Sequence, residues 1–252
     1  MSPRIPDNLR INADDFGLDP AISRAIFQAA RDGLINSFSV VPFSETDQES
    51  QHLLAAACTL TGLHIGAHLT FVGVPLLTRP AHFSDGIPPA DYRALVAAWA
   101  QGKVKPSAVR AEWSEQIALL QRRLGPARSI HHLDSHQHTH LLPGLWPVAR
   151  ALAQDHGIPN LRRPAEPTLR AWRKSFPLGA ALQLLAFARP GAAHEAFAGV
   201  GTSMGFRAEA YAALARQIRA QPRRRFELMV HPGQDARGQR ELDELERWLA
   251  RL

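Results

Sequence analysis

Polar and ionisable side chains crowd residues 133–140, and their types and spacing suit metal chemistry. The segment reads Leu-Asp-Ser-His-Gln-His-Thr-His, so Asp134, His136, His138 and His140 occupy every second position. In an extended chain alternate side chains share one face, and clustered neutral imidazoles are ligands that a metal ion accepts. No packed core requires this spacing. The segment therefore predicts a metal site, which other parts of the chain must complete.

Three further strand-like segments end in ionisable residues. Asp14 and Asp15 follow the first of these segments, His68 closes another, and His231 follows the last. Taken alone, His68 or His231 would be an ordinary core or strand-end histidine. In a barrel of parallel strands, however, the carboxyl ends of all strands open on one face, where active sites assemble. The sequence therefore predicts that these residues converge on the site of residues 133–140.

The pair Asp14 and Asp15 poses a geometric problem, because neighbours on a regular strand face opposite ways. Both can serve one site only if the chain turns there, and Gly17 supplies backbone freedom for a turn. The plain alternative is that one aspartate caps the next helix. The histidine-bearing strand ends elsewhere favour a functional role for the pair.

The elements that position these residues alternate between strand and helix. Strand-like runs lie at 9–13, 35–41, 63–69, 130–135, 158–163, 195–200 and 226–230; helical runs lie at 21–33, 45–58, 107–124, 147–156, 168–187, 206–220 and 239–252. This alternation predicts parallel strands joined by helical crossovers. About seven such units of one style favour a TIM-like (β/α) barrel in a single α/β domain over an open doubly wound sheet. No glycine-rich phosphate loop interrupts the pattern.

Residues 70–106 break the alternation and contain Pro75, Pro80, Pro88 and Pro89. A long excursion inside a compact domain is more often a functional loop than a linker. We therefore expect this segment to be a loop or lid inserted into the barrel.

Composition excludes several classes of protein. Hydrophobic residues make up 45% of the 252 residues, enough for a full core, and no apolar run approaches the ~18 residues of a transmembrane helix. The N-terminal residues are polar and contain prolines, unlike a secretory signal. The single cysteine, Cys58, excludes an internal disulfide and fits a reducing compartment, so we expect a cytoplasmic protein. The net charge of +6 is dispersed, and no aromatic-interleaved basic stripe predicts nucleic-acid binding.

At these motifs the chain resembles the YdjC-like family, whose best-known members are chitooligosaccharide deacetylases. The matching segments are Asn12–Gly17, Gly66–Leu69, Leu133–His140 and Met229–Gly233. Their order and spacing agree over nearly the whole chain. The first and third segments are specific, whereas the other two would be weak alone.

The resemblance implies one distorted barrel over residues 1–252 and a divalent ion held by Asp15, His68 and His136. It also implies that Asp14 is the catalytic base and that the reaction removes the acetyl group from an N-acetylated sugar. Arg162 lies where the family tends to carry a site arginine.

The kind of sugar is indicated by two short segments. Residues 166–172 are similar to relatives associated with hopanoid-lipid biosynthesis, whereas residues 134–136 look more like the oligosaccharide-acting members. The expected substrate is therefore an N-acetylated oligosaccharide or the head group of a glycolipid.

Hydrolysis of an amide also needs a proton for the departing amine, because an unprotonated amine leaves poorly. His231 is the expected donor, and His138 is the second candidate. Asp134, His138 and Arg162 are expected to bind substrate or to orient the groups that do. One carboxylate with two imidazoles suits magnesium or zinc, and also cobalt or manganese.

Two other interpretations remain. A metal-dependent phosphoesterase on the same rim would need a second metal ion or more phosphate-binding arginines. A non-catalytic carbohydrate- or metal-binding protein would bind its ion without any need for Asp14. A homodimer is compatible with the sequence in each case.

Overall fold

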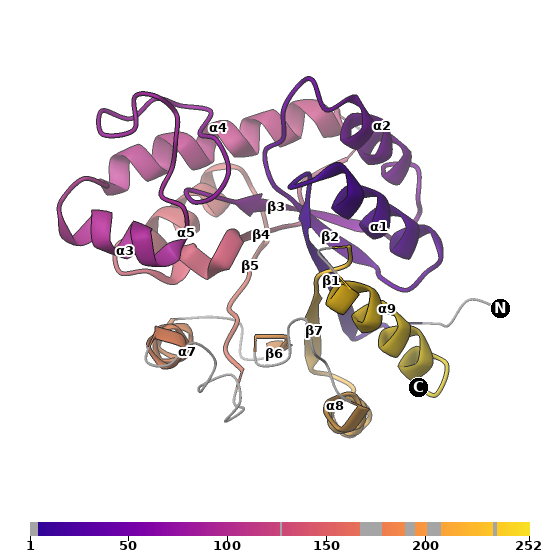
Figure 1. Ribbon diagram of the computed structural model, residues 1–252. Coiled ribbons are helices and arrows are strands. Elements are labelled where there is room, and N and C mark those ends of the chain that lie inside the picture. Colours follow the sequence, from indigo (N-terminus) through magenta and orange to yellow (C-terminus); the bar gives the residue numbers. More distant parts are fainter. Residues whose placement is uncertain (1–4, 127, 167–177, 190–194, 201–207, 234–235) are drawn as a thin grey trace.

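The computed structural model describes residues 5–126, 128–166, 178–189, 195–200, 208–233 and 236–252. Seven parallel strands form one curled sheet, a half-barrel with strand order β5-β4-β3-β2-β1-β7-β6. The helices surround the outside of the curl (Figure 1). Among the described residues β5 and β6 do not pair, so the curl is open between them. The predicted α/β barrel of about seven parallel strands is thus confirmed, in a distorted form.

The strands lie close to their predicted positions: β1 (Leu9–Phe16), β2 (Ser37–Val40), β3 (His64–Leu69), β4 (His132–Ser135), β5 (Asn160–Leu161), β6 (Glu195–Ala198) and β7 (Arg225–Val230). The helices are α1 (Pro20–Arg31), α2 (Gln48–Ala57), α3 (Tyr92–Ala100), α4 (Pro106–Leu124), η1 (His136–Leu141, a 3-10 helix), α5 (Leu145–Asp155), α7 (Leu178–Ala188), α8 (Ala208–Ala220) and α9 (Ala236–Leu249). The first ten residues of the helix predicted at 168–187 lie outside the described residues.

Short-range signals start the first helix where the sequence predicts it. The carboxylate of Asp19 accepts a hydrogen bond of 2.7 Å from the backbone N–H of Ala21, and Pro20 occupies the first turn. A side-chain cap satisfies a backbone donor that has no partner within the helix, and proline is favoured at this position. Helix α1 therefore begins directly after β1 and fixes the position of the Asp14–Gly17 turn.

The two faces of β1 have opposite character. Ile11 and Ala13 are fully buried in the hydrophobic core, which also includes Trp113 of α4. The alternate residues carry polar side chains, and Asn12 donates a hydrogen bond of 2.8 Å to Asp14. Because side chains alternate along a strand, one face of the sheet can bury apolar groups while the other holds a polar network. The candidate site is built on this polar face.

The segment at 70–106 contains helix α3 and is held by polar side chains of its neighbours. Glu112 of α4 accepts backbone N–H bonds of 3.0 Å from Leu77 and 2.7 Å from Thr78. Gln137 of η1 accepts one of 2.8 Å from the backbone of Tyr92 at the start of α3. The insertion is therefore anchored both to α4 and to the turn that follows β4. Its role as a lid stays a prediction.

No helix in the described part of the chain is both long and apolar enough to cross a lipid bilayer.

Candidate metal centre

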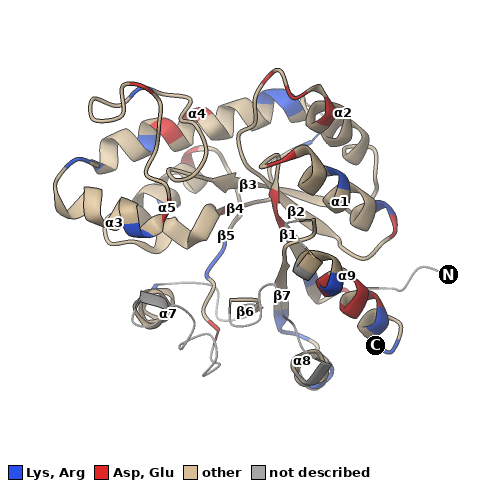
Figure 2. Ribbon diagram, in the orientation of Figure 1, with Lys and Arg blue, Asp and Glu red and all other residues tan. Residues whose placement is uncertain are grey.

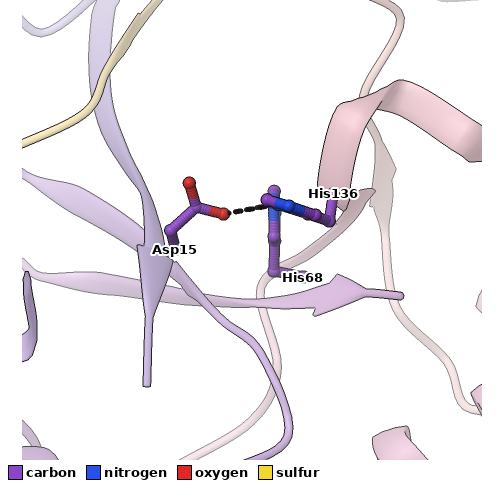
Figure 3. A group of neighbouring side chains, drawn as sticks. All are labelled: Asp15, His68 and His136. Carbon is purple, nitrogen blue, oxygen red and sulfur yellow. Dashed lines mark hydrogen bonds and ion pairs between the residues drawn. The ribbon is translucent and has the colours of Figure 1, made fainter. Parts of the chain in front are cut away.

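One carboxylate and two imidazoles meet at the carboxyl ends of their strands. Oδ1 of Asp15 lies 3.1 Å from Nε2 of His68 and 2.8 Å from Nδ1 of His136. The potential ligand atoms of the three residues all lie within 4.8 Å of one another. Figure 3 shows the three side chains converging from β1, β3 and the start of η1. A donor set of one carboxylate and two imidazoles fits a divalent metal ion.

A distortion of β1 lets two adjacent aspartates serve one site. The pairing of β1 with β2 shifts register between Ala13 and Phe16, and Asp15 has a φ of +76°. Positive φ is uncommon outside glycine, although aspartate tolerates it better than most residues. The sequence correctly predicts a turn here, but Asp15 itself takes the left-handed conformation in addition to Gly17, which has a φ of +92°. A bulge of this kind re-aims side chains at a strand end.

The extended geometry that would place the alternate residues of 134–140 on one face ends at Ser135, where the strand predicted at 130–135 also ends. The chain turns into η1 there, and Gln137 and His138 have φ values of +52° and +55°. The hydroxyl of Ser135 accepts a 3.0 Å hydrogen bond from the backbone N–H of His140, which closes the turn. Asp134, His136, His138 and His140 therefore do not share one face of a strand.

The turn separates the four residues into different environments. His140 is fully buried, with Nδ1 2.5 Å from the Ser135 hydroxyl and Nε2 3.0 Å from the backbone carbonyl of Arg162. The ring of His138 lies edge-on to Phe197, with centroids 6.3 Å apart. Burial, joined by the positive charge of Arg162, lowers the pKa of His138 well below its usual value.

Arg162 is the cationic centre of the site and is only 1% exposed. Its Nη1 and Nη2 lie 2.6 and 2.8 Å from the two oxygens of Asp14, and Nη2 is also 2.9 Å from Oδ2 of Asp134. Its Nε lies 2.7 Å from Oε1 of Glu227. Burial alone would raise the pKa of Asp14, but the charge and hydrogen bonds of Arg162 outweigh it and hold that pKa below its usual range.

Asp134 lies behind His68 and has no exposed surface. Its Oδ1 is 2.7 Å from Nδ1 of His68, so that Nε2 of the same ring faces Asp15. Burial would lower the pKa of His68, but the negative charge of Asp134 and their hydrogen bond raise it to about 10. A carboxylate that holds one ring nitrogen fixes the direction of the other nitrogen, an arrangement common around metal-binding histidines.

A second group of potential ligands consists of Asp14, His68 and Asp134. Arg162 already binds both of these carboxylates. Its guanidinium stays charged and cannot be deprotonated in proteins. The positive charge of Arg162 therefore already balances negative charge in this group. The carboxylate of Asp15, by contrast, contacts only the imidazoles of His68 and His136 among the pairs described above.

His231 follows β7 directly, one residue past the point where Val230 pairs with Ala13 of β1. Its backbone N–H donates a 2.7 Å hydrogen bond to Glu241 of α9. Its charge contributes to the lowered pKa of Asp14, so the imidazole lies within electrostatic reach of that carboxylate. The strand pairing thus brings both proposed catalytic residues to adjacent positions on the rim.

Three polar residues of the site are given no role in the sequence-based prediction. Glu227 pairs with Arg162 and also with Arg10; Asn12 donates to Asp14; and Ser39 contacts both Asn12 and His68. Glu227 carries the clearest signal, because a carboxylate inside the apolar run Phe-Glu-Leu-Met-Val is rarely buried unless it is paired.

Comparison with known proteins gives a family match over nearly the whole chain. The family model described as YdjC-like protein matches residues 8–249. A carbohydrate deacetylase of Vibrio campbellii is 31% identical over 149 residues, which are 59% of this chain and 56% of that protein. One from Mus musculus is 32% identical over 168 residues, or 65% and 52% of the two chains. A chitooligosaccharide deacetylase of Escherichia fergusonii is 27% identical over 156 residues, or 60% and 57%. The chain thus matches a little over half the length of these curated relatives.

A solved structure from Enterococcus faecalis V583, described as that of a candidate cellobiose-phosphate cleavage protein, resembles the chain along most of its length. The two share 22% sequence identity and a TM-score of 0.66, over 96% of this chain and 91% of the other. This likeness supports the fold.

Proposed function

The chain belongs to the YdjC-like family, and from this premise we propose that it is a hydrolase that removes the acetyl group from an N-acetylated sugar with the help of a divalent metal ion. The observation that carries the proposal is the convergence of Asp15, His68 and His136 beside a separately held carboxylate, Asp14. The names of the curated relatives, carbohydrate deacetylase and chitooligosaccharide deacetylase, support an acetylated sugar as the substrate class. An N-acetylated oligosaccharide or a glycolipid head group is the substrate expected from the sequence.

Asp15, His68 and His136 would hold one divalent ion, with magnesium or zinc as the first candidates and cobalt or manganese as alternatives. Such an ion, when bound, polarises a carbonyl group and lowers the pKa of water. Asp15 would bring negative charge to the centre. Asp134 would keep Nε2 of His68 directed at it.

Asp14 is the proposed general base. Arg162 keeps its carboxylate ionised and fixes its direction, while reducing its proton affinity. Its Oδ2 accepts a hydrogen bond from Arg162 and from no other described residue, so a lone pair remains on that oxygen. Asp14 would take a proton from the water that attacks the acetyl carbon.

Burial lowers the pKa of His138, the second candidate from the sequence, and so disfavours its protonated form; His231 is therefore the proposed proton donor. As the bond between the carbonyl carbon and nitrogen breaks, the departing nitrogen takes a proton from this imidazole, and acetate and a free amine result. Arg162 and Asp134 are expected from the sequence to bind substrate. Their burial supports an action through Asp14 and His68, while His138 remains the candidate for contact with the sugar.

The proposal is tested by measuring acetate release from N-acetylated oligosaccharides and glycolipids, with and without added divalent ions, together with metal content by mass spectrometry. Asp14→Asn should keep its metal and lose roughly 100-fold or more of its turnover, as expected for a lost general base. His136→Ala should lose both metal and turnover. His52→Ala, an exposed histidine of α2, is the matched control and should change neither.

Equal loss of metal in Asp14→Asn and His136→Ala would show that the two aspartates are wrongly assigned. Release of phosphate instead of acetate would favour the phosphoesterase interpretation. Metal binding without hydrolysis of any acetylated substrate would favour a non-catalytic binding protein.

A further inference from the structure

A pocket of about 450 Å³ lies between α8 and α9 and shares no lining residue with the candidate metal centre. The wall formed by α8 consists of Ala212, Ala215, Arg216 and Arg219, which follow one another at intervals of three, one and three residues. This spacing places them on one face of the helix. Beside the buried Tyr211 of the same helix, this part of the wall offers two alanines in place of large apolar side chains. The two helices therefore leave a hollow between them.

The pocket has an aromatic floor. The rings of Tyr211 and Trp248 pack with centroids 4.9 Å apart and planes inclined by 35°. Trp248 is only 8% exposed, and its indole N–H is buried without an acceptor among the described residues. Together the two rings give the pocket an apolar, aromatic surface.

The rim of the pocket is strongly positive. Arg216 and Arg219 of α8 line the pocket together with Arg247 of α9 and Arg251 just beyond it. Basic residues are blue on the ribbon of Figure 2. The one acidic residue of the lining, Glu244, is 2.6 Å from Arg247. The other three arginines form no ion pair with an acidic side chain in the described part of the chain. Guanidinium groups that gather without enough counter-charge repel one another, and an anion placed between them relieves this repulsion.

We propose that this pocket is a second binding site, which takes a small organic anion whose phosphate or carboxylate is attached to a flat apolar body. Arginine binds both oxyanions through paired hydrogen bonds, and the aromatic floor suits a planar ring. The volume lies within the usual range for small-molecule sites, about 300–1,000 Å³. The site shares no lining residue with the metal centre, and the proposal does not rest on the proposed hydrolysis.

The test is calorimetric titration of the full chain with 2-naphthyl phosphate, 2-naphthoate, 2-naphthol and inorganic phosphate. We expect one saturable site for at least one of the two naphthyl anions. Naphthol, which lacks the anionic group, and inorganic phosphate, which lacks the aromatic body, should each bind at least roughly tenfold more weakly. Stronger binding of the phosphate or of the carboxylate identifies which anion the site prefers.

Substitutions of pocket residues show whether the anion binds between α8 and α9. The double change Arg219→Gln and Arg247→Gln should weaken binding by roughly tenfold or more. Ala212→Leu fills the hollow without altering charge and should weaken it to a similar degree. The control is Arg122→Gln with Arg150→Gln, two exposed arginines of α4 and α5, which makes the same change in net charge and should leave affinity within about twofold.

Three results would overturn the proposal. They are the absence of saturable binding of either naphthyl anion up to about 10 mM, naphthol binding as tightly as the anions, and an equal loss in the control pair. Circular dichroism of each variant shows whether its fold is kept. Because Ala212→Leu and the arginine pair alter the pocket by different means, loss of folding in one leaves the other as the test.

Discussion

Replacing Arg162 with methionine should lower the free energy of unfolding by roughly 3–5 kcal/mol, the usual consequence of removing one partner from a buried ion pair. Arg162 is 1% exposed and is bound by three carboxylates, those of Asp14, Asp134 and Glu227. Methionine fills part of the same volume and supplies no charge. The three acidic groups would then share a low-dielectric interior without their common cation.

We expect a loss in the upper half of this range because of the few partners that the carboxylates keep in the variant. Glu227 keeps its ion pair with Arg10, so its loss is partial. Asp14 keeps only the neutral amide of Asn12 among its hydrogen-bond donors in the described residues. Arg162→Lys keeps one positive charge but cannot make the same set of directed hydrogen bonds, so its loss should be smaller than that of the methionine variant.

The difference in unfolding free energy between wild type and Arg162→Met should also depend on pH, and the pKa of Asp14 sets the direction of this dependence. In the wild type Arg162 holds the pKa of Asp14 below its usual range, so this group stays ionised at neutral and mildly acidic pH. In Arg162→Met burial acts without that charge, and the folded-state pKa rises above the unfolded one. A carboxyl group with a raised folded pKa contributes stability below that pKa, and the contribution is lost as pH rises through it. The gap between wild type and variant should therefore narrow from about pH 7 to about pH 5.

The assay is urea unfolding at both pH values, with chelator present so that metal binding does not enter the difference. Arg163→Met is the matched control. Arg163, the next residue along the chain, donates one hydrogen bond to the backbone carbonyl of Arg189 and pairs with no carboxylate in the described residues. It should lose less than about 1 kcal/mol. A comparably small loss in Arg162→Met, or a gap that widens on acidification, would refute the idea of a desolvated charge network.

Three further predictions concern the surroundings of the site. Asp134→Asn should weaken metal affinity by roughly 10–100-fold through the lost charge behind His68, measured by competition with a chelator; unchanged affinity would contradict this role. Gly66→Ala places a Cβ 2.2 Å from Nε2 of His132. It should cost about 1–3 kcal/mol in urea unfolding, and most of that cost should vanish in a His132→Ala background; equal costs would show that the ring is not the obstacle. Glu112→Gln should release the loop between β3 and α3 and speed its hydrogen exchange at least about tenfold, with no change in α8.

The sequence is sufficient to predict the fold and the meeting of distant residues. Alternating apolar strands and amphipathic helices require parallel crossovers, and Asp19 with Pro20 marks the start of a helix before any tertiary contact is considered. Parallel strands then bring their carboxyl ends to one rim. For this reason Asp15 and His68 can be assigned to one place although they are 53 positions apart in the sequence.

The turn after β4 could not be predicted in the same way. Left-handed backbone at Gln137 and His138 carries no glycine signal, and of the two only histidine is among the residues enriched in that conformation. The turn depends on the Ser135 hydroxyl and on the backbone of the 70–106 insertion, which Gln137 binds. Alternation along the sequence suggests four side chains on one face, whereas these tertiary hydrogen bonds send them into separate environments.

The different roles proposed for Asp14 and Asp15 follow from their neighbours. The two residues are of one type and adjacent, and both are buried. Arg162 meets Asp14 with a guanidinium that neither leaves nor loses its proton. His68 and His136 meet Asp15 with imidazoles, whose ring nitrogens are donors that accept a metal ion in place of a proton. A divalent ion can therefore exchange with protons around Asp15, but around Asp14 it would have to displace a buried arginine. The charge that surrounds each carboxylate thus favours Asp15 as the ligand and leaves Asp14 as the fixed, ionised base beside it.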